Sequence, residues 1–265
     1  MTVKIGSSLP SKLGARTRME DGDLIVELNP QKQMLNHGIV RASVLSFVVD
    51  AVAGLPLDQD SDVWTLTSDM TIRMRPMRAP ERIDATSVVL RQGRRSATCL
   101  VELKTDKGAP IAEGAVGFTQ IPRKITDPRK PKVQLGYRSR VFGASPGLAR
   151  PLREEAGIQT IDAAEGVVHV EITPELRNGA GTLQGAMVAL LAEAAAEDLM
   201  ATRFESHFVV TQLDLRYLRR ATTGPVRTRC KLLGIGAEAP LQIELIDTST
   251  DEITTLVYAN AINAF

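Results

Sequence analysis

Two stretches of this chain repeat each other at a nearly constant separation, which restricts the fold to two copies of one unit. VELNP at 26–30 recurs as VEITP at 170–174, an offset of 144 residues. GIVRASVLSFVVD at 38–50 matches GTLQGAMVALLAE at 181–193, and TSDMTIRMR at 67–75 matches TQLDLRYLR at 211–219. The sequence therefore predicts that one domain has been duplicated within a chain of 265 residues.

Both copies predict the same order of elements: a hairpin-like start, a helix and four strands. The first strands are expected at 24–29 and 167–173, each after a turn that contains glycine. The helices are expected at 40–52, before Gly54-Leu55-Pro56, and at 183–202; both are too apolar to lie on a surface. The later strands are expected at 63–74, 82–92, 96–105 and 110–121 in copy one, and at 207–218, 225–235, 240–247 and 252–263 in copy two.

A buried helix followed by antiparallel strands predicts an α+β fold in which each sheet wraps a central helix. Apolar and basic residues alternate along 226–232, as they do in a sheet with one solvated face. We place the first domain at 1–122, a Pro-, Gly- and Lys/Arg-rich linker at 123–147, and the second domain at 148–265, with a short helix near 148–156. The basic run 123–132 is expected to be solvated.

Composition excludes several classes of function. The 32 basic and 31 acidic residues nearly cancel, so neither nucleic acid nor an anionic membrane is an expected partner. No apolar run is long enough to insert in a membrane, and the N-terminus does not resemble a signal peptide. Cys99 and Cys230 are far apart, which predicts free cysteines, no zinc site and a cytoplasmic location. No metal or nucleotide cofactor motif is present.

The helix starts carry a spaced set of polar residues. In copy two the set is Asn178, Gly181, Gln184-Gly185-Ala186 and Glu193, with the acid nine residues after Gln184. In copy one, Arg41 precedes Asp50 by the same nine residues. This spacing resembles that of hotdog thioesterases of the phenylacetate-degradation and 4-hydroxybenzoyl-CoA type, whose signature is Asn and Gly ahead of His-Gly-Gly, with an acid nine positions after the His. The chain departs from it, since Arg41 and Gln184 replace the His and neither copy has paired glycines.

The resemblance implies two hotdog domains that pair within one chain as a pseudo-dimer, with sites at the interface between the domains. One site would join Asp50 to the helix start at Asn178, Gln184 and Gly185. The other would join Glu193 to the helix start formed by Asn36, His37 and Arg41. Asp50, Glu193, Asn178 and Gly185 are the candidate catalytic residues, and Gln184, Arg41, Asn36 and His37 the candidate substrate-binding residues. The resemblance also implies that such chains assemble further into homo-oligomers.

Thioester hydrolysis needs a carboxylate that attacks the carbonyl or activates water, and a helix N-terminus can stabilise the oxyanion through backbone N–H groups such as that of Gly185. Asp50 is the only charged residue from 42 to 57 and lies late in an apolar helix, where an ionised acid is costly. Its alternative is a solvated or capping Asp. For Glu193 the alternative is a solvated stripe with Glu197, one turn on.

The other candidates also have simpler interpretations. Asn178 and His37 could each belong to a local turn. Arg41 could pair with Glu193 across the interface instead of binding substrate. The favoured function is an acyl-CoA or acyl-carrier-protein thioesterase, with coenzyme A present only as part of the substrate. The alternatives are a catalytically inactive hotdog protein that binds acyl-CoA or fatty acid, and a hotdog hydratase or dehydratase. The acyl group and the carrier are not specified by the sequence.

Overall fold

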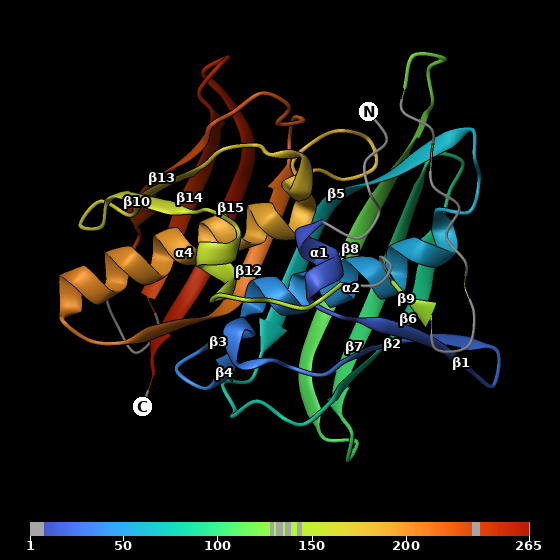
Figure 1. Cartoon of the computed structure of the whole chain (residues 1–265), viewed down its shortest axis with the longest axis horizontal. Coiled ribbons are helices and arrows are strands. Elements are labelled where there is room, and N and C mark those ends of the chain that lie inside the picture. The colour runs from blue at the N-terminus through green and yellow to red at the C-terminus, as the bar shows by residue number, and fades with distance from the viewer. Residues whose placement is uncertain are drawn as a thin grey trace.

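The computed structural model describes residues 8–127, 130, 135, 139–141, 145–234 and 239–264. Among them, thirteen strands form one antiparallel sheet in the order β10-β11-β13-β14-β15-β12-β5-β8-β7-β6-β2-β1-β9, and two short strands, β3 and β4, form a separate ribbon (Figure 1). The strands of the sheet are β1 Arg16–Glu20, β2 Asp23–Leu28, β5 Val63–Met74, β6 Ile83–Gln92, β7 Ser96–Thr105, β8 Pro110–Pro122, β9 Ser139–Arg140, β10 Gln159–Asp162, β11 Val167–Val170, β12 Phe208–Tyr217, β13 Val226–Leu232, β14 Ala239–Asp247 and β15 Glu252–Asn263. The ribbon strands are β3 Leu35–Asn36 and β4 Ile39–Val40.

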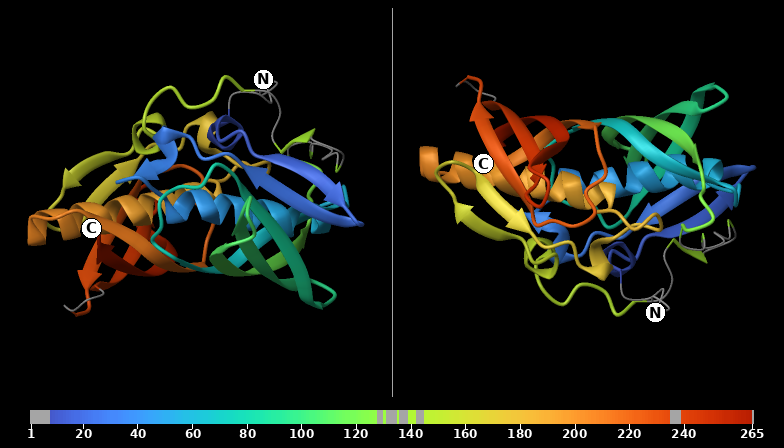
Figure 2. Two further views of the ribbon diagram at one scale, coloured as in Figure 1. Left: turned by 90° about the horizontal axis from the view of Figure 1, so that it is seen from below. Right: turned by 90° about the horizontal axis from the view of Figure 1, so that it is seen from above.

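Two long helices lie inside the curve of this sheet: α2 (Ala42–Leu57) and α4 (Gly185–Phe204). Figure 2 shows them along one line across the molecule, α4 towards one end and α2 towards the other, with sheet strands on both sides. Short helices, α1 (Leu9–Lys12) and α3 (Leu152–Glu155), precede the first strands of each half, and 3₁₀ turns, η1 (Lys32–Met34) and η2 (Pro174–Leu176), precede the long helices. Nearly every side chain of α2 from Ala42 to Val52 is buried, so the predicted central helices are confirmed.

The duplication is visible in the sheet order. Strands β1, β2, β6, β7, β8 and β5 of the first copy match β10, β11, β13, β14, β15 and β12 of the second. The two halves meet where β5 pairs with β12 in antiparallel register, Thr71 opposite Asp214 and Met70 opposite Leu215. The Thr71 hydroxyl also donates a hydrogen bond to Asp214 Oδ1 (3.0 Å). The two domains therefore share one continuous sheet as well as a helix contact.

Helix α2 continues through the predicted stop at Gly54-Leu55-Pro56. It ends at Leu57, five residues after the predicted end at residue 52. Proline lacks the N–H that would bond to the carbonyl four residues earlier, here that of Val52. The Ser87 hydroxyl on β6 supplies the missing donor, at 3.2 Å from the Val52 oxygen. A tertiary hydrogen bond thus permits Pro56 within the last turn, which the local sequence alone does not reveal.

The basic run after the first domain is less solvated than its composition predicts. Lys130 is buried, and its ammonium group donates to the carbonyls of Asp60 (2.6 Å) and Val63 (2.9 Å) and pairs with Asp58. Trp64 lies beneath it and donates from Nε1 to Asp127 (3.0 Å). Lys130 therefore anchors this segment to the end of α2. Residues 128–129 and 131–132 of the run lie outside the described residues.

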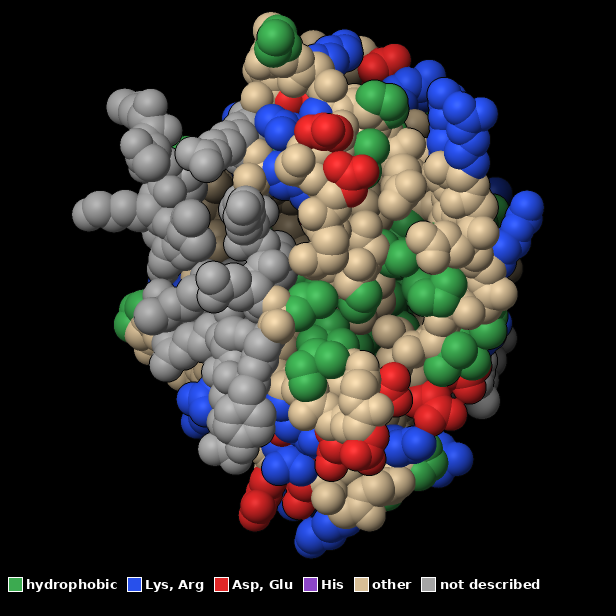
Figure 3. Space-filling model, turned by 90° about the vertical axis from the view of Figure 1, so that its right-hand side faces the viewer, with side chains coloured by type: hydrophobic (Ala, Val, Ile, Leu, Met, Phe, Trp, Pro, Cys, Tyr) green, Lys and Arg blue, Asp and Glu red, His purple; other side chains and the backbone are tan. Residues whose placement is uncertain are grey.

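The end of the molecule that carries β1, β2 and β6 has apolar side chains on its surface (Figure 3). Three consecutive residues near the end of β6, namely Val88, Val89 and Leu90, are among the exposed large hydrophobic residues. A β-bulge between Val89 and Arg91 interrupts the alternation of the strand there. None of the helices in the described ranges is both long and apolar enough to cross a membrane.

Gly114 of β8 allows α2 to pack closely on the sheet. A Cβ at this position would lie 2.9 and 3.0 Å from the Cγ atoms of Val49 on α2. We expect Gly114→Ala to lower the free energy of unfolding by about 1–3 kcal/mol through overpacking. The double variant Gly114→Ala/Val49→Ala is expected to lose less than the sum of the single losses, measured by urea denaturation.

Gly93→Ala is the control for that comparison, because a Cβ there meets its nearest neighbour, Ser96 Oγ, at 3.4 Å, an ordinary contact. Strict additivity of the Gly114 and Val49 substitutions would contradict the close packing.

Candidate active site

The long helices run antiparallel, so that the start of each lies beside the middle of the other. Their N-caps are Arg41 and Gln184, the two residues from which the nine-residue spacing to an acid was counted. Glu193 of α4 reaches the first turn of α2, where its carboxylate accepts from the backbone N–H of Ala42. The structure therefore brings helix starts and acids together across the domain interface.

Asp50 lies half-buried on α2, with little around it to stabilise a negative charge. The Thr67 hydroxyl on β5 donates a hydrogen bond to Asp50 Oδ1 (2.5 Å). Burial raises the pKa of Asp50 to about 6; the Thr67 bond opposes the rise and the charge of Asp58 adds to it. No cation pairs with Asp50 among the described residues. It is therefore a carboxylate that titrates close to neutral pH.

Tyr217 of β12 connects this acid to the start of α4. Its hydroxyl donates to the carbonyl oxygen of Gly185 (3.1 Å), and its ring is close enough for Asp50 to raise its pKa further. The larger cause of that raised pKa is burial, so Tyr217 stays a neutral donor. A Cβ on residue 185 would lie 3.2 Å from the Tyr217 hydroxyl, which explains the glycine there.

The N-terminus of α4 retains a donor for a ligand. Gln184 caps the helix with its own side chain, whose Oε1 accepts from the N–H of Ala186 (2.9 Å), and its carbonyl accepts from Met187. The N–H of Gly185, the first residue of the helix, bonds to none of the described residues. An unpaired N–H at a helix start, at the positive end of the helix dipole, is a group that can stabilise an oxyanion.

The pseudo-equivalent site around Glu193 is closed by its own side chains. Glu193 Oε1 accepts from the N–H of Ala42 (2.8 Å), and Oε2 from the Ser43 hydroxyl (2.5 Å). Only 1% of Glu193 is exposed. Burial, followed by the charge of Glu197, raises its pKa, while Arg41 opposes the rise. The N–H that is free in the α4 site is thus occupied here by a carboxylate of the protein.

Arg41 completes this closed site, which we call the Arg41 cluster (Asn36, Arg41, Ser43, Glu193 and Glu197). Arg41 Nη1 lies 2.8 and 2.7 Å from the two oxygens of Glu197 and 3.7 Å from Glu193 Oε2. Asn36 Nδ2 donates to Glu197 Oε1 (2.6 Å) and to the carbonyl of Phe208 (3.0 Å). Glu193 and Glu197 therefore form a buried ionic network, not the solvated stripe that was the alternative.

Two further candidates lie in local structure. Asn178 Oδ1 accepts from the N–H groups of Ala180 (3.0 Å) and Thr182 (3.1 Å), which organises the turn before Gln184. His37 is exposed, adopts a positive φ of 49°, and stacks on His207 with 4.1 Å between ring centroids. Burial lowers the pKa of His37, and the His207 charge lowers it further. No contact joins Asn178 or His37 to either acid at hydrogen-bond distance among the described residues.

Sequence reasoning did not identify Tyr217, Thr67, Ser43 or Glu197 as site residues. Tyr217 lies in a repeated stretch of the sequence, where the first copy has Arg73 at the corresponding position, 144 residues earlier. This difference between the copies was the sequence feature that could have pointed to Tyr217. The roles of Thr67 and Ser43 depend on which strand or turn faces each acid, information that only the fold supplies. No group of three or more His, Cys, Asp or Glu in the described ranges could hold a metal ion.

Comparison with known proteins identifies the fold. No family model matches the sequence, and no curated protein matches it significantly. Among solved structures, the tesB protein of Mycobacterium avium subsp. paratuberculosis superposes with a TM-score of 0.63 at 12% identity, over 97% of this chain and 98% of that one. The 12:0-ACP thioesterase of Umbellularia californica gives 0.62 at 8% identity, over 91% and 94%. A hotdog-fold protein of unknown function from Alicyclobacillus acidocaldarius gives 0.61 at 10%, over 97% and 98%.

These likenesses cover nearly the whole chain, so the fold is two hotdog domains in tandem, as the sequence predicted. At such low identity the likeness shows the fold alone.

The Arg41 cluster predicts a strong dependence of stability on one cation. Arg41→Met would leave two buried carboxylates without a counter-charge, and we expect it to lower the free energy of unfolding by about 3–5 kcal/mol at pH 7.5. Adding Glu197→Met is expected to restore most of the loss. Arg229→Met, which breaks the exposed Arg229–Glu244 pair, serves as the control and should cost no more than about 1 kcal/mol. The free energies of unfolding are measured by urea denaturation. Equal losses in Arg41→Met and Arg229→Met would refute the role of Arg41 as the counter-charge of the cluster.

The raised pKa of Asp50 predicts a pH-dependent stability difference. The folded protein binds the proton on Asp50 more tightly than the unfolded chain, so this group's contribution to stability is lost as pH rises from about 4 to 6. Asp50→Asn removes the charge, and we expect it to raise the free energy of unfolding at pH 8 by about 1–3 kcal/mol. The difference from wild type should shrink towards pH 4, measured by urea titrations across this range.

Asp62→Asn, at an exposed position, is the control and should show no such trend. A less stable Asn variant at pH 8 would mean that the Thr67 bond outweighs the burial cost.

Proposed function

We propose that this protein hydrolyses acyl thioesters at one site, formed by Asp50, Thr67, Gly185 and Tyr217. The observation that carries the proposal is the difference between the two helix starts. The first N–H of α4 bonds to none of the described residues, and Asp50 interacts electrostatically with Tyr217, which bonds to Gly185; the first N–H of α2 is instead bonded to Glu193. Among the described residues, only the α4 site combines a helix-start N–H that has no partner with an acid that has no cation partner.

The chemistry follows from this arrangement. The thioester carbonyl oxygen would accept the N–H of Gly185, where the positive end of the α4 dipole stabilises the charge that develops on it. Ionised Asp50 would attack the carbonyl carbon or remove a proton from a water that attacks it. When water attacks, the C–S bond breaks and the thiolate takes up the proton that Asp50 removed from that water. When Asp50 attacks, the C–S bond breaks to leave an acyl anhydride on Asp50 and the thiolate takes up a solvent proton; water then hydrolyses the anhydride, which releases the acid and restores Asp50. Tyr217 holds the first turn of α4 in place through the Gly185 carbonyl.

Each residue of the site comes from a different element. Asp50 lies on α2 and Thr67 on β5, both in the first domain, and Gly185 lies on α4 and Tyr217 on β12 in the second. A site built from these residues would therefore exist only when the two halves are paired. The solved structures of similar fold include proteins named as acyl-ACP thioesterases, which makes an acyl thioester of coenzyme A or of acyl-carrier protein the substrate class to test.

Asn178 and Gln184 remain proposed as supports of the α4 site. Asn178 shapes the turn that leads into Gln184, and Gln184 caps the helix, so both act on the position of Gly185 through local structure. The Nδ2 group of Asn178 donates to none of the described residues and could reach a substrate. We assign Arg41, Asn36 and Glu193 to interdomain anchoring instead, because their polar groups are already bonded to one another or to backbone.

The test is release of free thiol from short, aromatic and long acyl-CoAs. Because the proposed base or nucleophile is lost, Asp50→Asn is expected to lower kcat/KM by about 10²–10⁴-fold. Wild-type kcat/KM should rise with pH through about 6, where Asp50 ionises. Glu193→Gln is the matched variant at the pseudo-equivalent acid and should retain turnover.

Loss of turnover in Glu193→Gln but not in Asp50→Asn would reverse the assignment of the two sites. Absence of turnover with every substrate, while acyl-CoA still raises the melting temperature of the wild type, would support the alternative of a binding protein.

A further inference from the structure

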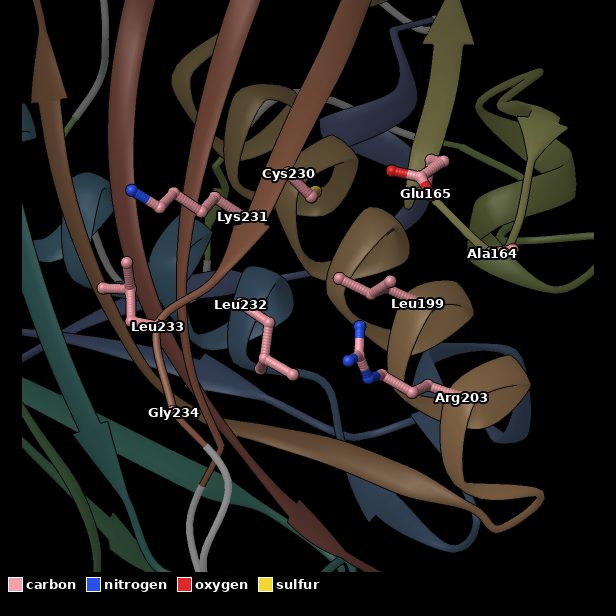
Figure 4. Close-up of a pocket in the computed structure, with 9 residues that line it drawn as sticks. All are labelled: Ala164, Glu165, Leu199, Arg203, Cys230, Lys231, Leu232, Leu233 and Gly234. Atoms are coloured by element: carbon pink, nitrogen blue, oxygen red, sulfur yellow. The ribbon is translucent and has the colours of Figure 1, made fainter.

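A hollow lies far from the proposed active site, at the other end of α4. It is a cavity of about 370 Å³ between the last turns of α4, the end of β13 and the turn before β11 (Figure 4). This volume is within the range of about 300–1,000 Å³ that holds small ligands. Gly185, at the α4 start, is 14 residues before Leu199 of the cavity wall, roughly 21 Å along a helix.

The cavity exists because β11 and β13 separate. They pair at only two positions, whereas the matching strands β2 and β6 pair at four. Beyond Val168 the gap is bridged by side chains: the Thr228 hydroxyl donates to the carbonyl of Gly166 (2.8 Å), and the Cys230 thiol contacts the same oxygen (3.2 Å). Helix α4, with 20 residues against 16 in α2, extends past this gap.

The walls combine two apolar side chains, Leu199 and Leu232, with charged side chains at the exposed rim, namely Glu165, Arg203 and Lys231. Leu199 and Arg203 lie one turn apart on the same face of α4, and Figure 4 shows the Arg203 guanidinium pointing toward Leu199 and Leu232. The Cys230 thiol also faces α4. Burial raises its pKa to about 12, so it remains neutral. Arg203 forms no hydrogen bond or ion pair within the described part of the chain.

The other polar groups restrict the charge of a ligand. Glu165, on the turn before β11, points toward the β13 side of the hollow and bears no cation partner among the described residues. Lys231 and Leu233 extend away from α4. Successive residues of a strand face opposite sides, so these two point away from the side that Cys230 and Leu232 face. One guanidinium opposite one carboxylate favours a ligand with a single negative charge over a polyanion such as coenzyme A.

We propose that this cavity binds a monocarboxylate with a short aliphatic chain. The carboxylate accepts hydrogen bonds from the Arg203 guanidinium, whose planar donors fit two carboxylate oxygens. The chain lies against Leu199 and Leu232. Such a molecule is the class of product that thioester hydrolysis releases, but the site depends on no residue of the proposed active site and its binding can be measured without turnover.

The experiment is calorimetric titration of the full chain with octanoate. Arg203→Gln is expected to weaken binding about tenfold, since it removes a hydrogen bond between charged groups. Glu165→Gln is expected to tighten binding several-fold, because it removes a like charge. Lys231→Gln is the matched control: it removes a neighbouring exposed cation that points away, and should leave affinity unchanged.

Two further probes separate this site from others. 1-Octanol and coenzyme A should each bind at least about tenfold more weakly than octanoate, because the first lacks the carboxylate and the second is a polyanion. The variants Asp50→Asn and Tyr217→Phe should keep the octanoate affinity of wild type. Octanoate binding that is absent, unaffected by Arg203→Gln, or lost in the Asp50 or Tyr217 variants would overturn the proposal, whatever the thioesterase assay shows.

Discussion

The antiparallel contact between the first halves of α2 and α4 is the constraint on which the rest of the structure depends. It places the N-terminus of each helix opposite an acid on the other helix, in the middle of a curved sheet that the β5–β12 pairing makes continuous. A helix start carries unpaired N–H groups and the positive end of a dipole, and it must find an acceptor when it is buried. The duplicated fold thus creates two places where a partner's carboxylate meets a helix start.

The acids at the two places differ by one methylene group. Glu193 is long enough to reach the N–H of Ala42, and in doing so it satisfies the start of α2. Asp50 is shorter by about 1.5 Å and bonds to Thr67 instead, so the N–H of Gly185 stays unpaired. The first arrangement stabilises the interface through a buried network with Arg41 as its cation. The second leaves an acid without a cation and a helix-start N–H without a partner among the described residues, which costs stability.

Much of this architecture could be predicted from the repeat. The offset of 143–144 residues identified two domains, the apolar stretches identified two buried helices, and the nine-residue spacing located both N-caps and both acids. The end of α2 was missed because the Ser87 bond that permits Pro56 comes from a distant strand. A solvated stripe of Glu193 and Glu197 stayed open as an alternative, because helical periodicity shows which residues share a face, not what covers that face. Tyr217 and Thr67 could not be placed, since strand register across the interface is a property of the folded sheet.

Duplication within one polypeptide explains why such asymmetry can exist. In a symmetric dimer of identical chains, each substitution appears in both sites, so a residue that closes one site closes the other. Once both halves belong to one chain, Arg41 and Glu197 can close the first helix start while Gln184, a neutral residue, caps the second. The closed site then contributes to interdomain stability, and that contribution offsets the cost of the unpaired acid at Asp50. The Arg41 cluster thus joins the two domains at the start of α2, whereas the start of α4 keeps an N–H that bonds to none of the described residues.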